Sequence, residues 1–283
     1  MSAITVDEAR ALLDSHDLIS LGMRADDDRR RRHGTRTTFV RVLEIHVDAV
    51  PAALPSAVDA GEVRLTGAPR SLEDAASAVV RARALAPDTP LTGFSLADLA
   101  ALAGGAIEGL REVLAAIRSA GLQAIADAPI DALDEAVGLI GAAREAGLQV
   151  PRLTVRKLAD ASRVDVIDRA RAVQAAVGGV RAFAPLPREI VTDQPSTGYD
   201  DVKQVAVARL LLEDIDSIQV DWALYGPKLA QVALTMGADD VDGVSALPGD
   251  LGRRRSPLEE IRGNIRSAGL EAVERTGLFA ARA

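Results

Sequence analysis

Short runs rich in β-branched residues alternate along the chain with longer segments whose apolar residues recur at helical spacing. Eight of the runs are predicted strands, at residues 38–46, 62–66, 91–95, 122–126, 153–156, 180–185, 217–221 and 240–244. Predicted helices cover residues 72–86, 106–120, 132–146, 164–177, 200–213, 228–236 and 257–267. Strands that alternate with helices pair in parallel, and a count of eight favours a closed barrel over an open sheet.

Residues 1–34 are predicted to form a helical segment that precedes the barrel. Asp26–Asp28 is followed directly by Arg29–Arg32, and such a charge run predicts a solvated helix face, with an anion or partner contact as the alternative. Residues 35–283 are then one α/β domain, a single (β/α)8 barrel of the TIM type with a short C-terminal extension. The connection at 47–61 is rich in Pro and Ala and is not predicted to be strongly helical.

The amino-acid composition excludes several classes of function for this protein. The 283 residues include 41 acidic and 33 basic side chains, which gives a formal charge of −8, and no cysteine. Nucleic acid is not expected as a partner, since phosphate binding needs a concentrated basic surface. The missing cysteine excludes disulfides, thiolate nucleophiles and cysteine-ligated iron–sulfur clusters. Without a run of about 20 apolar residues or a signal-peptide core, we expect a cytoplasmic protein with no membrane span.

The C-terminal third carries the most specific motifs. They are GYDDVK at 198–203, IQVDW at 218–222, GPKLAQ at 226–231 and GADDVDG at 237–243. Their order and spacing resemble radical S-adenosylmethionine (SAM) enzymes of the futalosine route to menaquinone. Those enzymes are aminofutalosine synthase and dehypoxanthine futalosine cyclase, with the deazaflavin synthase subunits as close relatives. The resemblance implies a SAM-binding (β/α)8-like barrel, in agreement with the strand count.

In these enzymes a C-x-x-x-C-x-x-C motif that holds the iron–sulfur cluster follows the first strand. Aligned without gaps, its three cysteines fall on Pro51, Pro55 and Val58, which have no side-chain donor for iron. The resemblance implies that the cluster binds SAM and delivers an electron, so radical SAM activity is not expected here. We expect no cofactor, the cluster being excluded at this position. The eroded glycine signatures after the third and fourth strands argue against SAM as well.

Seven residues at the predicted C-terminal strand ends remain candidates for ligand binding, because a barrel keeps its active site there. They are His46, Arg64, Arg156, Lys157, Asp221, Trp222 and Asp242. The histidine with either aspartate suits acid–base chemistry, and the three cationic side chains suit a carboxylate or phosphate. Core packing is the favoured role of the tryptophan. For each charged residue the favoured role is a structural salt bridge that fills the space of the cluster and SAM, and ligand binding is the alternative. No metal site is expected.

Three functions stay open. The first is a non-catalytic partner or regulatory subunit of a menaquinone-pathway enzyme, paired with a cysteine-bearing radical SAM paralogue or with a second copy of itself. The second is a cluster-free lyase, isomerase or transferase that uses the charged residues at the barrel mouth. The third is a binder of SAM or a futalosine-like nucleoside without turnover, which the eroded glycine signatures disfavour.

Overall fold

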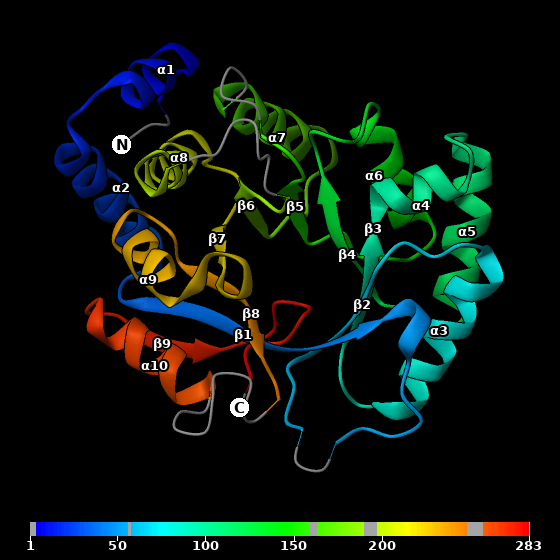
Figure 1. The fold of residues 1–283 in the computed structure, drawn as a ribbon. Coiled ribbons are helices and arrows are strands. Elements are labelled where there is room, and N and C mark those ends of the chain that lie inside the picture. Colours follow the sequence, from blue (N-terminus) through cyan, green and yellow to red (C-terminus); the bar gives the residue numbers. More distant parts are fainter. Residues whose placement is uncertain (1–3, 56–57, 159–162, 190–196, 248–256, 283) are drawn as a thin grey trace.

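The predicted strands close into a parallel barrel of eight, which confirms the fold class. A computed structural model describes residues 4–55, 58–158, 163–189, 197–247 and 257–282 (Figure 1). Around the ring the order is β2-β3-β4-β5-β6-β7-β8-β1, and β1 also pairs with β2. The strands are β1 Arg36–His46, β2 Glu62–Thr66, β3 Leu91–Ser95, β4 Ala124–Pro129, β5 Arg152–Val155, β6 Ala182–Pro187, β7 Ser217–Asp221 and β8 Asp240–Ser245.

Helices surround the barrel and connect most of its strands (Figure 1). They are α1 Val6–Asp14, α2 Leu18–His33, α3 Leu72–Leu85, α4 Leu96–Leu102, α5 Ile107–Ser119, α6 Ala136–Glu145, α7 Arg163–Val177, α8 Gly198–Leu211, α9 Trp222–Thr235 and α10 Pro257–Ser267. Between β1 and β2 the described residues contain only the 3-10 turn Val47–Ala49, as the composition of that connection predicts. The first two helices precede the barrel and pack against α8.

Two elements were not predicted. Helix α4 is separated from α5 by Gly104 and Gly105, whose φ angles of 69° and 78° break the helical run. A ninth strand, β9 (Glu271–Glu274), pairs in parallel with the first residues of β1, which is 11 residues long. The partner strand β2 reaches only the second half of β1, from Val42 onward, so the first half has a free edge that β9 covers.

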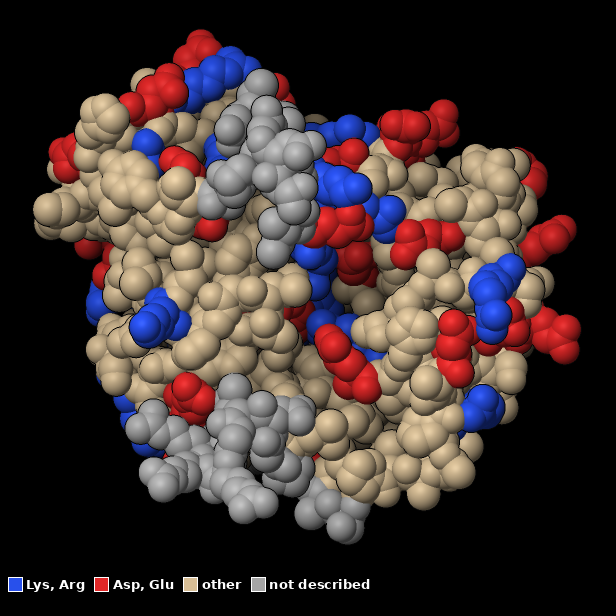
Figure 2. Space-filling model, in the orientation of Figure 1, with Lys and Arg blue, Asp and Glu red and all other residues tan. Residues whose placement is uncertain are grey.

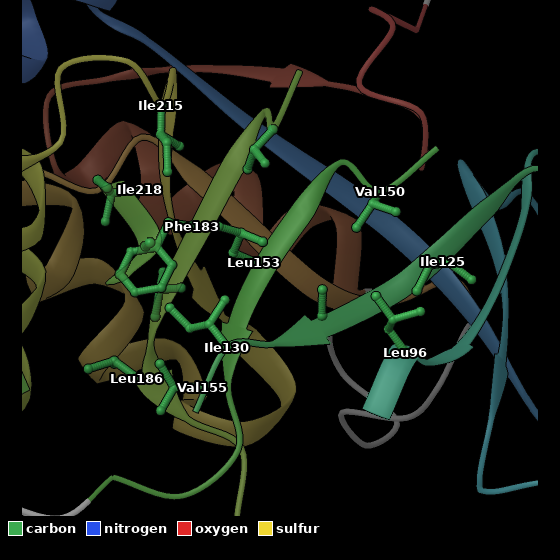
Figure 3. Packing of buried hydrophobic residues seen from close by; sticks show 14 of the residues in the cluster. Leu96, Ile125, Ile130, Val150, Leu153, Val155, Phe183, Leu186, Ile215 and Ile218 are labelled. Carbon is green, nitrogen blue, oxygen red and sulfur yellow. The ribbon is translucent and has the colours of Figure 1, made fainter. Parts of the chain in front are cut away.

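The hydrophobic core lies between the barrel strands and the surrounding helices. Figure 3 shows part of it, in which Phe183, Leu153 and Ile218 point from neighbouring strands into one apolar layer. All three side chains are fully buried. Each large apolar side chain buried in this way contributes about 1.5–3 kcal/mol, so aliphatic residues supply a large core although only 2% of residues are aromatic.

The charge run at the end of α2 is solvated only in part, since Asp27, Arg30 and Arg31 are exposed while Asp28 and Arg29 are buried. The Arg29 side chain is fully buried and pairs with Asp26 at 2.8 Å. Asp28 is also buried, and Arg32 donates hydrogen bonds to the carbonyl oxygens of Leu212 and Glu213 after α8. The run therefore joins the N-terminal helices to the barrel, because guanidinium groups bind the unpaired carbonyls at a helix end.

The inside of the barrel holds a buried ion-pair network rather than an apolar filling. Arg64 on β2 donates two hydrogen bonds to Glu62 and two to Asp242 on β8, at 2.7–3.1 Å. Arg152 on β5 also pairs with Asp242, and Thr92 donates to Glu62 at 2.6 Å. Burial alone would raise the pKa of Asp242, but Arg152 and Arg64 hold it well below its usual value. This network, Glu62–Arg64–Asp242–Arg152, ties three strands together across the barrel.

A second buried cluster lies nearer the amino ends of the strands. The Asp240 carboxylate accepts hydrogen bonds from Arg275, Thr38 and Gln219 at 2.5–2.6 Å. Arg275 follows β9, so the C-terminal extension contributes a cation to the barrel interior. The neighbouring Asp239 pairs with the buried Arg209 of α8 on the other side of β8. Asp239 and the two aspartates of β8, Asp240 and Asp242, thus have structural partners.

We expect Asp242→Asn to lower the free energy of unfolding by about 3 kcal/mol, because it leaves Arg64 and Arg152 buried with too little opposing charge. Urea unfolding followed by circular dichroism measures this. Asp48→Asn removes the same charge from an exposed pair with Arg70 and should cost less than about 1 kcal/mol.

The same variant should show a defined pH dependence. The pKa of Asp242 is lower in the folded protein, so its contribution is fully present above the unfolded value of about 3.9 and is lost as the pH falls through the folded value. The difference between wild type and Asp242→Asn should therefore shrink in acid. A difference that stays constant down to the acid transition would contradict the ion-pair assignment.

Candidate functional site

A charged cavity of about 240 Å³ opens at the carboxyl ends of the strands. On the face drawn in Figure 2 the surface is hollowed near its centre, where basic and acidic side chains gather. The cavity is lined by Glu44, Arg64, Leu65, Thr66, Gly67, Phe94, Ser95, Asp98, Ala126, Asp127, Arg156, Arg188 and Glu189. The buried network forms its floor, because Arg64 belongs to both. We call this space the charged cavity.

A second cavity of about 300 Å³ adjoins it between β1, β8 and the first residues of α9 and α10. It is lined by Val42, Glu44, Trp222, Ala223, Gly243, Ser245, Leu247 and Pro257. Only one of these residues, Glu44, carries a formal charge, so we call the space the apolar cavity. Glu44 lines both cavities and therefore lies where they meet. The strand-end mouth thus offers a polar half and an apolar half to one ligand.

Most charges of the mouth are matched by a partner. Arg156 pairs with Asp98 at 2.6 Å and donates to the Ser95 hydroxyl at 3.2 Å. The guanidinium of Arg188 lies within 3.3 Å of Asp221 and 3.7 Å of Asp127. These pairs hold the arginine side chains in place around the cavity and keep them charged.

Glu44 differs from these carboxylates. Among the described residues its carboxylate forms no hydrogen bond and no ion pair within 4.0 Å, although Arg64 lies on the neighbouring strand opposite it. The Glu44 side chain is exposed to the water of the mouth, yet the protein around it removes part of its solvent and raises its pKa, and the charges of Asp221 and Asp242 add to that rise. A carboxyl group with a raised pKa in a cavity is typical of functional sites.

The structure brings four of the seven predicted site residues to the cavities or their floor. Arg64 and Arg156 line the charged cavity, Trp222 lines the apolar cavity, and Asp242 lies beneath with no exposed surface. Asp221 is beside them as the partner of Arg188, and its carboxylate also caps α9 through the Leu224 N–H.

The other two predicted residues lie at the edge. Within the described part of the chain, His46 contacts neither Asp221 nor Asp242, and its Nδ1 accepts a hydrogen bond from the Asp48 N–H. Lys157 is mostly exposed and pairs with Glu189 at 3.1 Å. The acid–base pair that the sequence suggested for His46 is therefore not formed in this geometry.

The positions aligned with the cluster cysteines hold no donor in the structure either. Pro51 and Pro55 are exposed, and Val58 packs partly buried against the core. In the described ranges no group of three or more His, Cys, Asp or Glu side chains is placed to hold a metal ion. The residues present do not fit an iron–sulfur cluster, because iron in such clusters is held by thiolates.

Sequence reasoning missed Glu44, Asp98, Arg188 and Glu189. Glu44 lay inside a predicted strand rather than at its end, and a charged residue in a strand of a closed barrel was the available signal. Arg188 lay beyond the predicted end of its strand at residue 185, whereas β6 continues to Pro187. Asp98 lies on α4, a helix that was not predicted.

Comparison with known proteins identifies the class of this barrel. One similar protein is aminodeoxyfutalosine synthase of Thermus thermophilus, 36% identical over 135 residues. Another is 5-amino-6-(D-ribitylamino)uracil–L-tyrosine 4-hydroxyphenyl transferase 1 of Methanosarcina barkeri, 33% identical over 135 residues. In both, the match covers 41% of this chain and 36% of the relative. The chain is homologous to these enzymes, which confirms the resemblance to the radical SAM enzymes of the futalosine route. No family model matches it.

Solved structures support the fold over nearly the whole chain. HydG, a maturase of the [FeFe]-hydrogenase, superposes with a TM-score of 0.64 at 14% identity, over 96% of this chain and 72% of its own. Methylornithine synthase (PylB) gives the same score and identity over 95% and 94%. At such low identity these neighbours establish the barrel fold alone.

In the described residues no helix is long and apolar enough to cross a bilayer.

We expect Glu44→Gln to raise the melting temperature near neutral pH. The folded protein disfavours the charged form of Glu44, so the wild type loses stability as the pH rises through the raised pKa. The variant has no such charge, so its advantage should shrink as the pH falls through the raised pKa and vanish below the unfolded value of about 4.3. Thermal unfolding between pH 4 and pH 8 in parallel with Glu112→Gln, an exposed position on α5, measures the effect. A pH-independent difference would contradict the raised pKa.

Proposed function

We propose that this protein is a cluster-less homologue of the futalosine-route enzymes that carries out no radical SAM chemistry. It acts as a non-catalytic partner or regulatory subunit of a menaquinone-pathway enzyme that does bear the cysteines. The observation that carries the proposal is the connection after β1, where Pro51, Pro55 and Val58 occupy the places of three iron ligands in a chain with no cysteine. The barrel around that connection is intact.

The packing of the barrel interior supports this proposal. The network of Arg64, Arg152, Glu62 and Asp242 stabilises the closed barrel without a cofactor. Two apolar side chains one helical turn apart on α2, Ile19 and Met23, are 78% and 64% exposed. Exposed apolar side chains of this size are typical of surfaces that bind another protein.

One assay tests both parts of the proposal. Formation of 5′-deoxyadenosine from SAM is measured after reconstitution with iron, sulfide and a reductant. The three samples are this chain, a cysteine-bearing relative from the same organism, and both together. We expect no product from this chain alone and about a fivefold change in rate when it is added to the relative, a coupling typical of regulatory binding. The two proteins should elute together from a sizing column.

Product from this chain alone would refute the loss of radical chemistry. An unchanged rate together with separate elution would refute the partner role. Ile19→Glu with Met23→Glu should abolish the effect on the relative while leaving thermal stability near that of the wild type, because both residues are exposed.

A second candidate function is the binding of a small molecule at the mouth, with or without turnover. The adjoining charged and apolar cavities favour it. Trp222 is the single tryptophan of the chain and lines the apolar cavity, so its fluorescence reports on occupancy there. SAM and adenosine are the first compounds to titrate, and a fluorescence change that saturates would support the second candidate. An unchanged signal at millimolar concentration would exclude useful affinity for these two compounds.

A further inference from the structure

We propose that the mouth of the barrel binds a small organic cation, whose positive group is held by Glu44 and whose hydrocarbon part fills the apolar cavity. The inference rests on the second candidate function, small-molecule binding at the mouth, and names the chemical class of the ligand. Two observations support it. Glu44 is the carboxylate of the mouth that has no basic partner within 4.0 Å among the described residues, and it lies where the two cavities meet.

The charges around the mouth are matched except at Glu44. Each of the other carboxylates there has a basic partner within 4.0 Å among the described residues. The pairs are Asp98 with Arg156, Asp127 and Asp221 with Arg188, and Glu189 with Lys157. Glu44 is exposed to the water of the mouth and has no counter-ion, so a cation that enters the mouth finds an unpaired carboxylate there.

The arginines of the mouth are poor sites for an anion. Arg188 already lies within 4.0 Å of three carboxylates, those of Asp127, Asp221 and Asp242. Arg156 is paired with Asp98. The Arg188 Nε has no hydrogen-bond partner among the described residues, but an anion placed there would be repelled by the three carboxylates around this guanidinium, whereas a cation at Glu44 meets no such repulsion from an adjoining basic partner within 4.0 Å.

The cation is organic rather than a metal ion. A divalent metal takes six or more oxygen ligands in most protein sites, and Glu44 offers one carboxylate. In the part of the chain that the structure describes, no three acidic or histidine side chains converge on one point. The apolar cavity instead provides Val42, Trp222 and Leu247 as surface for a hydrocarbon body. An ammonium group attached to an apolar ring or chain matches both halves of the mouth.

Binding of such a cation is coupled to the proton on Glu44. The charged groups that face Glu44 are Arg64 on β2, Arg188 after β6, Asp221 on β7 and Asp242 on β8. Partial loss of solvent around the carboxyl and the two aspartates favour the protonated form, and the arginines oppose it. A bound cation favours the ionised form, so affinity should fall as the pH drops through the pKa of Glu44, with proton release on binding.

Three compounds of equal shape and different charge test the inference. They are cyclohexylammonium, cyclohexanol and cyclohexanecarboxylate, titrated into the full chain with Trp222 fluorescence and calorimetry as readouts. We expect cyclohexylammonium to bind about tenfold more tightly than cyclohexanol at pH 8, and the carboxylate more weakly than either. The preference for the cation should decrease at pH 5.

Glu44→Gln keeps the size of the side chain and removes its charge. It should reduce cyclohexylammonium affinity to the level of cyclohexanol, about tenfold, and leave cyclohexanol binding unchanged. Glu112→Gln on the outer helix α5 is the matched control and should leave all three affinities unchanged. Thermal unfolding confirms that both variants are folded.

The outcomes separate the inference from the function on which it rests. If all three compounds bind with equal affinity, or if Glu44→Gln leaves the cation preference intact, the cation site is refuted while binding at the mouth stands. Tighter binding of the carboxylate would likewise refute it and assign the arginines as the ligand site. If none of the compounds changes Trp222 fluorescence or gives heat at millimolar concentration, the inference is refuted and the second candidate function loses its support.

Discussion

The fold depends on one buried interaction, the ion pairs that Arg64 and Arg152 form with the Asp242 carboxylate. These three charges have almost no contact with solvent, and each would be costly to bury alone. Together with Glu62 they balance one another's charge and link β2, β5 and β8 around the ring, although the buried Arg152 Nε has no hydrogen-bond partner among the described residues. The pairing also sets the floor of the mouth, since Arg64 is at once a member of the network and a wall of the charged cavity.

In this cysteine-free chain the barrel closes around charged side chains of its own. The interior is held by ion pairs whose members come from β2, β5, β8 and the residue after β9. Above them the strand ends carry a matched set of charges with one carboxylate in excess. Homology to aminodeoxyfutalosine synthase therefore describes the scaffold, and the side chains at the mouth describe what this particular chain is able to bind.

Several features were predictable because they depend on local sequence. The strands Glu62–Thr66, Leu91–Ser95 and Ser217–Asp221 and the helix Pro257–Ser267 were predicted with the bounds observed. Short β-branched runs and turn glycines carry that information within a few residues. Strand β9 was missed because its four residues have no apolar alternation, and its existence depends on the free edge of β1 about 230 residues earlier.

By itself the sequence determined the barrel, the resemblance to the futalosine-route enzymes and the absence of cysteine, because periodicity, motif spacing and composition are properties of the chain in one dimension. Only the tertiary structure decided which charged side chains are buried, which are paired and which have no partner. It placed Asp242 between two arginines, buried the Arg29 that looked solvated, and left Glu44 without a counter-ion between two cavities. The physical reason is that the energy of a charge depends on its distance to other charges and to water, and residues far apart in sequence set those distances only after the chain has folded.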